Sequence, residues 1–311
     1  MNFSRLSRVF RNSRLSWPIR MLRQATSAAS ESQYVSRVAR LSNTSTLESR
    51  AGELQRTISS VDEVFLLGSG SSVLDVPSNL WERISSQISI GFGPWALHNF
   101  VPNIYAYGPT RGLRDYNRVI REVMNRSDIV TKRPDVLFLR SDLPEDIETI
   151  RSLPEPHRSQ TYIYGRVSPM SDSRAEIYRE MRHWHLDDSN FRNCIAFDSG
   201  STLVRLISLL MLLRAKKIIL VGVDLNTVEY FWERAPHFLA NNGFESFDTG
   251  QSGSVHDTLL PSSRPSGVVP LIEDMRRLAI EDLDCEIEVV SARSALASAI
   301  PLYTPTGGRL F

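Results

Sequence analysis

A short apolar run followed by glycines and serines is the first stretch of this sequence whose residue types predict chemistry. Residues 64–67 are all apolar, and residues 68–72 read Gly-Ser-Gly-Ser-Ser. Glycines allow backbone N–H groups to approach a phosphate closely, and serine hydroxyls add further donors. The run is neither the full dinucleotide-binding fingerprint nor a P-loop, because no lysine follows it. It is interpreted either as a phosphate-binding turn or as a plain strand-to-turn connection.

Apolar and amphipathic segments alternate around this turn. Helical spacing predicts helices at 202–213 and 268–283, among others. The alternation predicts an α/β fold with a mostly parallel, Rossmann-like sheet, helices on both faces and a smaller lid-like insertion. Apolar runs predict strands at 64–67, 87–92, 104–107, 135–139, 161–164, 217–221 and 287–290.

Several of the predicted strands end in glycine, at Gly68, Gly93, Gly108 and Gly222. In parallel α/β sheets, ligands bind outside the carboxyl ends of the strands. We therefore expect these strand ends to meet at one crevice. Their convergence favours the nucleotide-binding interpretation of residues 68–72 over the plain turn.

Composition limits the class of protein. A chain of 311 residues with 41% hydrophobic and 23% charged residues predicts a soluble protein with one large α/β domain, or one domain and a subdomain. A net charge of +1 argues against nucleic acid as a partner. Cys194 and Cys285 lie far apart, so neither a disulfide framework nor a zinc site is expected, and a cytoplasmic, reducing location is favoured.

The first 30 residues differ from the rest, because six arginines and several apolar residues precede the first acid, Glu31. Three interpretations stay open: a basic amphipathic segment that lies on an anionic membrane surface through residues 1–23, an organelle transit peptide, or a disordered tail. Residues 31–60 are interpreted as a helical linker. Residues 61–311 form the predicted nucleotide-sugar-binding domain, with lid segments near 166–198 and 226–265.

Further motifs follow the first turn in a recognisable order. Ser199 and Gly200 open a strongly apolar helix, the next strand ends in Gly-Val-Asp at 222–224, and Tyr230 and His256 come after it. This order resembles the bacterial sialyltransferases of the Campylobacter type, glycosyltransferase family 42, and related capsule and lipopolysaccharide glycosyltransferases. The resemblance covers roughly residues 63–303 and is most specific at 199–256.

The resemblance implies a GT-A-like sialyltransferase variant that transfers an acidic keto-sugar from a CMP-activated donor to a surface glycan or glycolipid. The implied transfer is inverting and needs neither a metal nor a cofactor. By residue-to-residue correspondence, His256 would be the general base that deprotonates the acceptor hydroxyl, and Tyr230 would donate to the departing phosphate. The implied donor-binding residues are Gly68, Ser69, Gly70, Ser72, Gly93, Ser199, Gly200, Gly222 and Asp224, with Asp224 on the ribose hydroxyls.

The sequence departs from the family pattern at three positions. Ser69 and Gly93 stand where the family has asparagines, and Asn226 stands where it has a second tyrosine. Each change removes or shortens a hydrogen-bond donor, and losing one such donor typically costs about 3 to 4 kcal/mol of transition-state stabilisation. Trp232, Glu233 and His237 lie in the same loop and are the candidate replacements.

Two other functions remain as alternatives. The first is a catalytically silent nucleotide-binding or assembly protein of a glycan machine, which the three departures favour. The second is phosphoryl transfer by a protein that resembles the archaeal pterin pyrophosphokinases, which would require a magnesium site. Both use the same fold, so a panel of nucleotides with and without magnesium distinguishes them.

Three other sequence features are interpreted as non-catalytic. His183 and His185 would share one face of a strand, but no third metal ligand follows at a suitable spacing, so a surface aromatic cluster or acceptor-site wall is favoured. Asp282 and Asp284 match the Asp-x-Asp of metal-dependent glycosyltransferases but are interpreted as a solvated helix end. Ser199 lacks the Gly-x-Ser-x-Gly setting of a hydrolase nucleophile.

Overall fold

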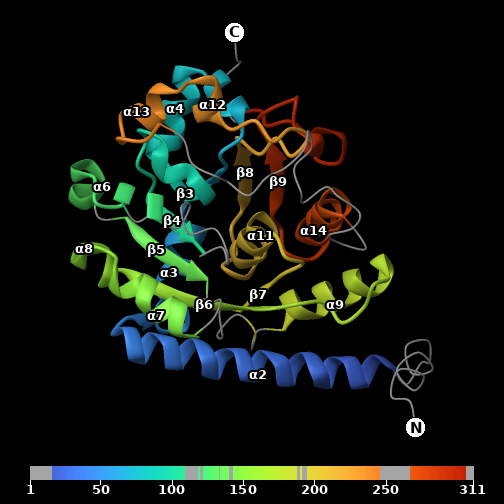
Figure 1. Ribbon diagram of the computed structural model, residues 1–311. Helices are drawn as coiled ribbons and strands as arrows, with labels where there is room; N and C mark the ends of the chain where they lie inside the picture. Colours follow the sequence, from blue (N-terminus) through green and yellow to red (C-terminus); the bar gives the residue numbers. More distant parts are fainter. Residues whose placement is uncertain are drawn as a thin grey trace.

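The computed structural model describes residues 16–108, 118–119, 122–132, 134–139, 143–187, 190, 195–245 and 267–305. The chain forms an α/β fold in which helices flank a mostly parallel sheet (Figure 1). The described strands are β1 (Ser45–Thr46), β2 (Val64–Leu67), β3 (Ile88–Phe92), β4 (Ile104–Tyr107), β5 (Asp135–Leu139), β6 (Thr161–Val167), β7 (Ile195–Phe197), β8 (Lys217–Val221) and β9 (Glu286–Val289). The predicted fold class is confirmed.

The order of the strands places a switch point near the middle of the sheet. The strands run β1-β6-β5-β4-β3-β2-β8-β9, and β7 pairs with the end of β6. From β2, the strands β3 to β6 follow one another on one side, whereas β8 and β9 lie on the other side. The order therefore reverses between β2 and β8, and in open α/β sheets ligands bind at the carboxyl ends of strands beside such a reversal.

Burial on both faces explains why the strands are continuous apolar runs. In β2, Val64 and Leu66 belong to one buried cluster, and Phe65 and Leu67 belong to another on the opposite face. The described helices are α2 (Ser16–Ser42), α3 (Ala51–Ser60), α4 (Ser78–Ser86), α6 (Ser127–Lys132), α7 (Leu143–Arg151), α8 (Glu155–Arg158), α9 (Arg174–Leu186), α11 (Thr202–Leu212), α12 (Phe231–Arg234), α13 (His237–Ala240) and α14 (Val268–Asp282), with short 3-10 turns η1 (Leu47–Arg50), η2 (Ser71–Asp75), η3 (Gly93–Leu97) and η5 (Ala295–Ser298).

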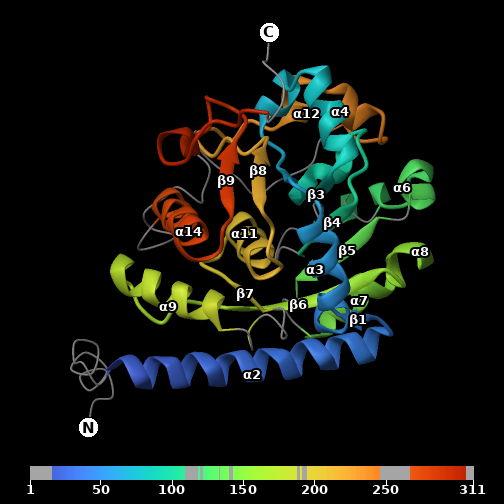
Figure 2. The same cartoon turned by 180° about the vertical axis from the view of Figure 1, so that it is seen from behind.

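The N-terminal region differs from the predicted division of the chain. The boundary expected at residue 30 falls inside α2, a single helix that packs along β6 and α7 and contacts β7 (Figures 1 and 2). Ala28, Val35 and Val38 on its inner face are buried, so apolar packing holds it as part of the domain. Among the described helices, none has the length and apolar character needed to cross a membrane.

The segments predicted as lids contain regular structure. The 166–198 segment holds the end of β6, all of α9, and β7. Ion pairs fasten α9 to α14, through Arg174 with Asp274 at 2.7 Å and Arg182 with Asp282 at 2.6 Å. The second segment, 226–265, begins with α12 and α13, and its part from residue 246 onward lies outside the described residues.

Candidate functional site at the switch point

Two turns meet at the switch point, one after β2 and one after β8. The N–H of Gly68 donates to the Val221 carbonyl oxygen, and the N–H of Gly70 donates to the Gly222 carbonyl oxygen, each over 2.8 Å. These bonds continue the pairing of β2 with β8 beyond the strands. Residues that are about 150 positions apart in sequence therefore form one rigid unit at the edge where the fold places ligands.

The glycines of this unit are required by the approach of the two turns to each other. A Cβ atom on Gly68 would lie 2.7 Å from the Gly222 carbonyl oxygen, and one on Gly222 would lie 2.4 Å from the Gly68 carbonyl oxygen. Gly222 also has φ +66°, which disfavours other residues. A Cβ on Gly70 would lie 2.5 Å from a carboxylate oxygen of Asp224. Contact within the chain is thus a sufficient reason for all three glycines.

Ser72 and Asp224 form the polar centre of the unit. Asp224 is 5% exposed, and its Oδ2 accepts from the Ser72 N–H at 2.9 Å. The Ser72 hydroxyl donates to the other carboxylate oxygen, Oδ1. The Asp224 carbonyl oxygen also accepts from the N–H groups of Asn226 at 2.8 Å and Ala295 at 2.9 Å. The carboxylate is therefore held in one orientation, and each of its oxygens keeps a second lone pair.

Tyr230 lies directly against the first turn. It forms an antiparallel bridge with Gly70, flanked by a hydrogen bond from the Phe231 N–H to the Ser69 carbonyl oxygen at 3.1 Å. Its ring stacks on Trp232, with 4.4 Å between ring centroids and an interplanar angle of 8°. Glu233 accepts from the Tyr230 N–H at 2.7 Å. The predicted catalytic tyrosine and the predicted nucleotide cradle therefore lie side by side.

An aromatic cluster around His98 packs against the start of α12, next to Tyr230. His98 stacks on Trp95 at 4.5 Å and on Phe238 at 4.9 Å, and it meets Phe231 edge to face at 5.3 Å. Burial, together with the positive charge of Arg126, lowers the pKa of His98 to about 4. The imidazole is neutral at pH 7, so it acts as an aromatic packing group that immobilises the start of α12.

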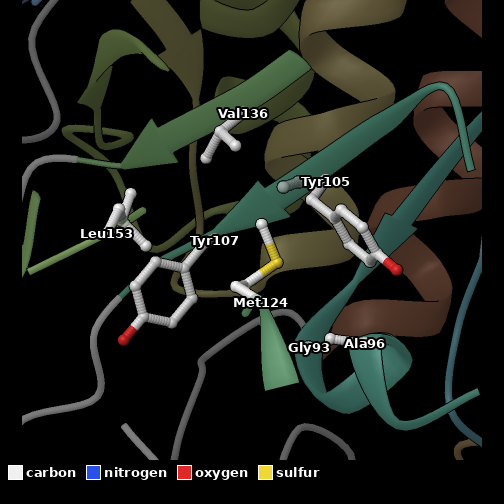
Figure 3. A pocket seen from close by; sticks show the side chains of 8 residues that line it. Gly93, Ala96, Tyr105, Tyr107, Met124, Val136 and Leu153 are labelled. Atoms are coloured by element: carbon white, nitrogen blue, oxygen red, sulfur yellow. The ribbon is translucent and has the colours of Figure 1, made fainter. Parts of the chain in front are cut away.

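Gly93 lies one strand further along the sheet, at the end of β3. The Ser69 hydroxyl reaches back to the Phe92 carbonyl oxygen at 3.5 Å, which links the first turn to this strand. Gly93 has φ +62° and begins η3. It lines a cavity of about 10 Å³ together with Tyr105, Tyr107 and Met124, among others (Figure 3). Such a volume suits about one water molecule, so this side of Gly93 faces packed side chains.

Ser199 and Gly200 belong to a different polar cluster, at the start of α11. Asp198 is 1% exposed and accepts from Arg166 at 3.1 Å, from Arg205 at 3.2 Å and from the Gly200 N–H at 2.6 Å. The Ser199 Oγ is buried and has no hydrogen-bond partner among the residues that the structure describes. Sequence reasoning missed Arg166, Asp198 and Arg205. One signal was present, because Arg205 is the only charged residue in the otherwise apolar helix α11.

The other residues predicted for the site are His256, the three candidate replacements in the loop, and Asn226. His256 lies outside the described residues. Of the three candidate replacements in the loop, Trp232 is buried in the stack with Tyr230, Glu233 accepts from the Tyr230 N–H, and His237 is exposed. The Asn226 side-chain amide donates to the Arg293 carbonyl oxygen at 2.7 Å.

The competing metal signals do not form sites in the described part of the chain. His183 and His185 lie on α9, where His183 is exposed and both Trp184 and His185 are buried, so these three residues do not form a surface cluster. His185 contacts the Met181 carbonyl oxygen at 2.8 Å and the Ser208 Oγ at 3.0 Å, and burial lowers its pKa to about 4. Asp282 pairs with Arg182. Among the described residues, no group of three or more metal-ligating side chains occurs.

Comparison with known proteins adds no relative. No protein-family model matches the chain, and no curated protein matches it significantly in sequence. What is established is the architecture, a mostly parallel sheet with its strand order reversed between β2 and β8. The chain is an α/β protein with a Rossmann-like sheet.

Proposed function

We propose that the protein is a nucleotide-sugar-dependent glycosyltransferase whose donor binds at the switch point between β2 and β8. One observation carries the proposal. Tyr230 lies against Gly70, beside the Ser72–Asp224 pair, at the edge of the sheet where nucleotides bind in such folds. These residues come from distant parts of the sequence, and the resemblance to family 42 assigns all of them to one donor site.

The proposed reaction follows from these residues. The acceptor hydroxyl oxygen attacks the anomeric carbon of a CMP-activated acidic keto-sugar, the bond from that carbon to the phosphate oxygen breaks, and CMP leaves. The Tyr230 hydroxyl donates to the departing phosphate, where negative charge grows in the transition state. His256 takes the proton of the acceptor hydroxyl, a role that suits imidazole at neutral pH. The second lone pairs of the Asp224 carboxylate accept from the ribose hydroxyls.

One observation favours the second candidate, a nucleotide-binding or assembly protein without transferase activity. Four N–H groups of the first turn already donate within the chain. Gly68 bonds to the last residue of β8, Gly70 to the turn after it, Ser71 to the Glu229 carbonyl oxygen at 3.2 Å, and Ser72 to Asp224. A phosphate would therefore meet side-chain hydroxyls rather than a ring of free backbone donors, which weakens the stabilisation of a leaving group.

A thermal-shift panel with CMP, CDP, UDP, GDP and ATP, each with and without magnesium, tests the proposal. CMP without metal is expected to raise Tm, since a ligand at about 100 times its Kd adds about 2.7 kcal/mol of stability. Tyr230→Phe is expected to keep CMP binding and to lower the rate of sugar transfer by about 100-fold or more. Stabilisation by ATP with magnesium would support phosphoryl transfer. CMP binding without transfer from any CMP-sugar would support the second candidate, and no response to CMP would contradict the proposed donor.

A control variant separates loss of the site from loss of the fold. Ser86→Ala removes an exposed hydroxyl at the end of α4, which bonds only to the nearby Arg83 carbonyl oxygen at 2.8 Å. It is expected to match the wild type in both Tm and transfer. The proposed peripheral location on the inner face of a membrane concerns another part of the molecule, and its structural basis follows.

A further inference from the structure

The outward face of α2 combines positive charge with exposed apolar side chains. Half of the large apolar side chains that are exposed among the described residues lie on this one helix: Ile19 at 41%, Leu22 at 70%, Tyr34 at 42% and Leu41 at 41% exposure. Arg23, Arg37 and Arg40 are exposed on the same helix. We call these seven residues the α2 stripe. At about 3.6 residues per turn, they share about 120° of the helix circumference.

The acid of α2 itself and the acid that pairs with Arg20 face inward. Glu31 is the only acid in the helix; it is 8% exposed and accepts from the Arg166 N–H at 3.1 Å. Arg20 also turns inward, where it makes a bidentate pair with Glu176 of α9 at 2.6 and 2.8 Å. Among the described residues, no ion pair involves the three arginines of the stripe. The stripe therefore carries positive charge and no acid, with Arg23 toward its first half and Arg37 and Arg40 toward its end.

The position of α2 makes the stripe accessible to a flat surface. Both views show the helix lying along one end of the molecule, with its axis tangential to the rest of the fold (Figures 1 and 2). Its 27 residues span about 40 Å at about 1.5 Å per residue. The preceding sequence has the same character, since residues 1–15 contain Arg5, Arg8, Arg11 and Arg14 and no acid.

We propose that the α2 stripe docks the protein on a surface of anionic lipid headgroups. Basic residues bind such surfaces, and each one near the surface contributes about a fivefold gain in affinity. The apolar side chains of the stripe enter the interface between headgroups and acyl chains, as in amphipathic helices that lie on membranes. A second copy of the chain is a poor occupant, because two stripes would bring arginines against arginines.

This docking extends the contact well beyond residues 1–23 and sets the orientation of the molecule. The helix lies at one end of the fold, and α12, which begins beside Tyr230, lies at the opposite end in both views (Figures 1 and 2). A protein docked through α2 therefore turns the switch point away from the bilayer. The acceptor of the proposed transfer would then approach from solution or on a long carrier.

Vesicle sedimentation of the full chain tests the proposal. Vesicles of phosphatidylcholine are compared with vesicles that also contain phosphatidylserine, at low and high salt. The wild type is expected to bind the anionic vesicles and to be released by salt. The triple variant Arg23→Gln, Arg37→Gln, Arg40→Gln is expected to bind on the order of 100-fold more weakly.

A matched triple variant removes the same charge elsewhere. Arg118→Gln, Lys216→Gln and Arg234→Gln change exposed residues outside α2, and binding is expected to stay within about threefold of the wild type. Circular dichroism and Tm of both triple variants verify that the fold is intact. A variant with Arg5, Arg8, Arg11 and Arg14 changed to Gln separates the contribution of the preceding sequence from that of the stripe.

Several outcomes would overturn the proposal. Equal binding of the wild type to neutral and anionic vesicles would exclude an electrostatic surface. Equal loss in the two triple variants would show that net charge matters and the stripe does not. Complete loss in the Arg5 to Arg14 variant alone would assign the contact to the preceding sequence. Self-association of the wild type that the stripe variant abolishes, measured by sedimentation velocity, would identify a second copy as the occupant.

Discussion

At the switch point, the polar groups of the turns after β2 and β8 are paired with each other, whereas the arginines of the α2 stripe face solvent. Gly68 donates to the last residue of β8, and Gly70 and Ser72 donate across to the turn after it. Arg23 and Arg37 are exposed on a face without acids. In the first region, the hydrogen-bonding groups bond to each other and stabilise the fold. In the second, the charged groups stay exposed, where a partner outside the chain can bind them. Mutations in the two regions should therefore affect different measurements.

The largest expected effect is at Gly222. Gly222→Ala places a Cβ 2.4 Å from the Gly68 carbonyl oxygen at a residue with φ +66°. Strained backbone and overpacking together should lower the free energy of unfolding by on the order of 4 kcal/mol. Chemical denaturation measures this change.

Gly243→Ala is the matched control for that variant. Gly243 has φ +77°, and a Cβ there would meet nothing within 4 Å. Only the backbone cost remains, about 1 kcal/mol. If the two variants lost equal stability, the packing of the two turns against each other would not be what requires Gly222.

The second largest effect is expected from low pH, which protonates His98, the residue that packs against Phe231 at the start of α12. Burial, with the nearby positive charges of Arg126 and His237, lowers the pKa of His98 from 6.5 to about 4. The unfolded chain therefore binds more protons than the folded chain between these values. Stability is complete above pH 6.5 and falls as the pH drops to about 4, by up to about 3 kcal/mol from this residue.

Denaturation at a series of pH values measures this slope. His98→Gln loses aromatic packing, so it should be less stable at pH 7, but its stability should fall less steeply toward pH 4 than that of the wild type. Identical slopes would mean that folding does not lower the pKa of His98. The α2 helix contains no histidine, so the charge of its stripe does not change over the same range.

A smaller effect is expected at Ser72. Ser72→Ala removes the hydroxyl that donates to Asp224 and leaves one oxygen of a buried carboxylate without this partner. The expected loss is about 2 kcal/mol. Ser86→Ala should change the stability by less than about 0.5 kcal/mol. A loss at Ser72 no larger than that of the Ser86 variant would show that Asp224 is solvated and free to bind a ligand directly.

The sheet was predictable because its strands are buried on both faces. Val64–Leu67 and Lys217–Val221 carry that signal in every position or nearly so, and the structure has both strands at the predicted bounds. The strands β1 and β7 have two and three residues and give no such signal. The continuity of α2 through residue 30 was also missed, because the change in composition there suggested a boundary and tertiary packing overrides it.

The reason for the glycines in the turns after β2 and β8 was not predictable from the sequence. A glycine that lets a phosphate approach and a glycine that lets another turn approach leave the same sequence pattern, because both need only the absence of a Cβ. The structure supplies the second reason for Gly68, Gly70 and Gly222. The pairing of Ser199 and Gly200 with Arg166 and Arg205 depends on how β6, β7 and α11 meet, which one-dimensional spacing does not encode.

The smallest effect is expected in an experiment that tests the switch point and the α2 stripe together. If α2 docks on lipid while the switch point faces away, anionic vesicles should leave the affinity for CMP unchanged within about twofold, because the two regions lie at opposite ends of the fold and salt screens the charge of the vesicle surface (Figures 1 and 2). Titration of CMP with and without vesicles measures this. A large loss of CMP affinity on vesicles would place the bilayer over the switch point, and the protein would then dock through a surface other than the α2 stripe. Equal affinities, combined with loss of vesicle binding in the stripe variant, would establish two independent sites at opposite ends of one fold.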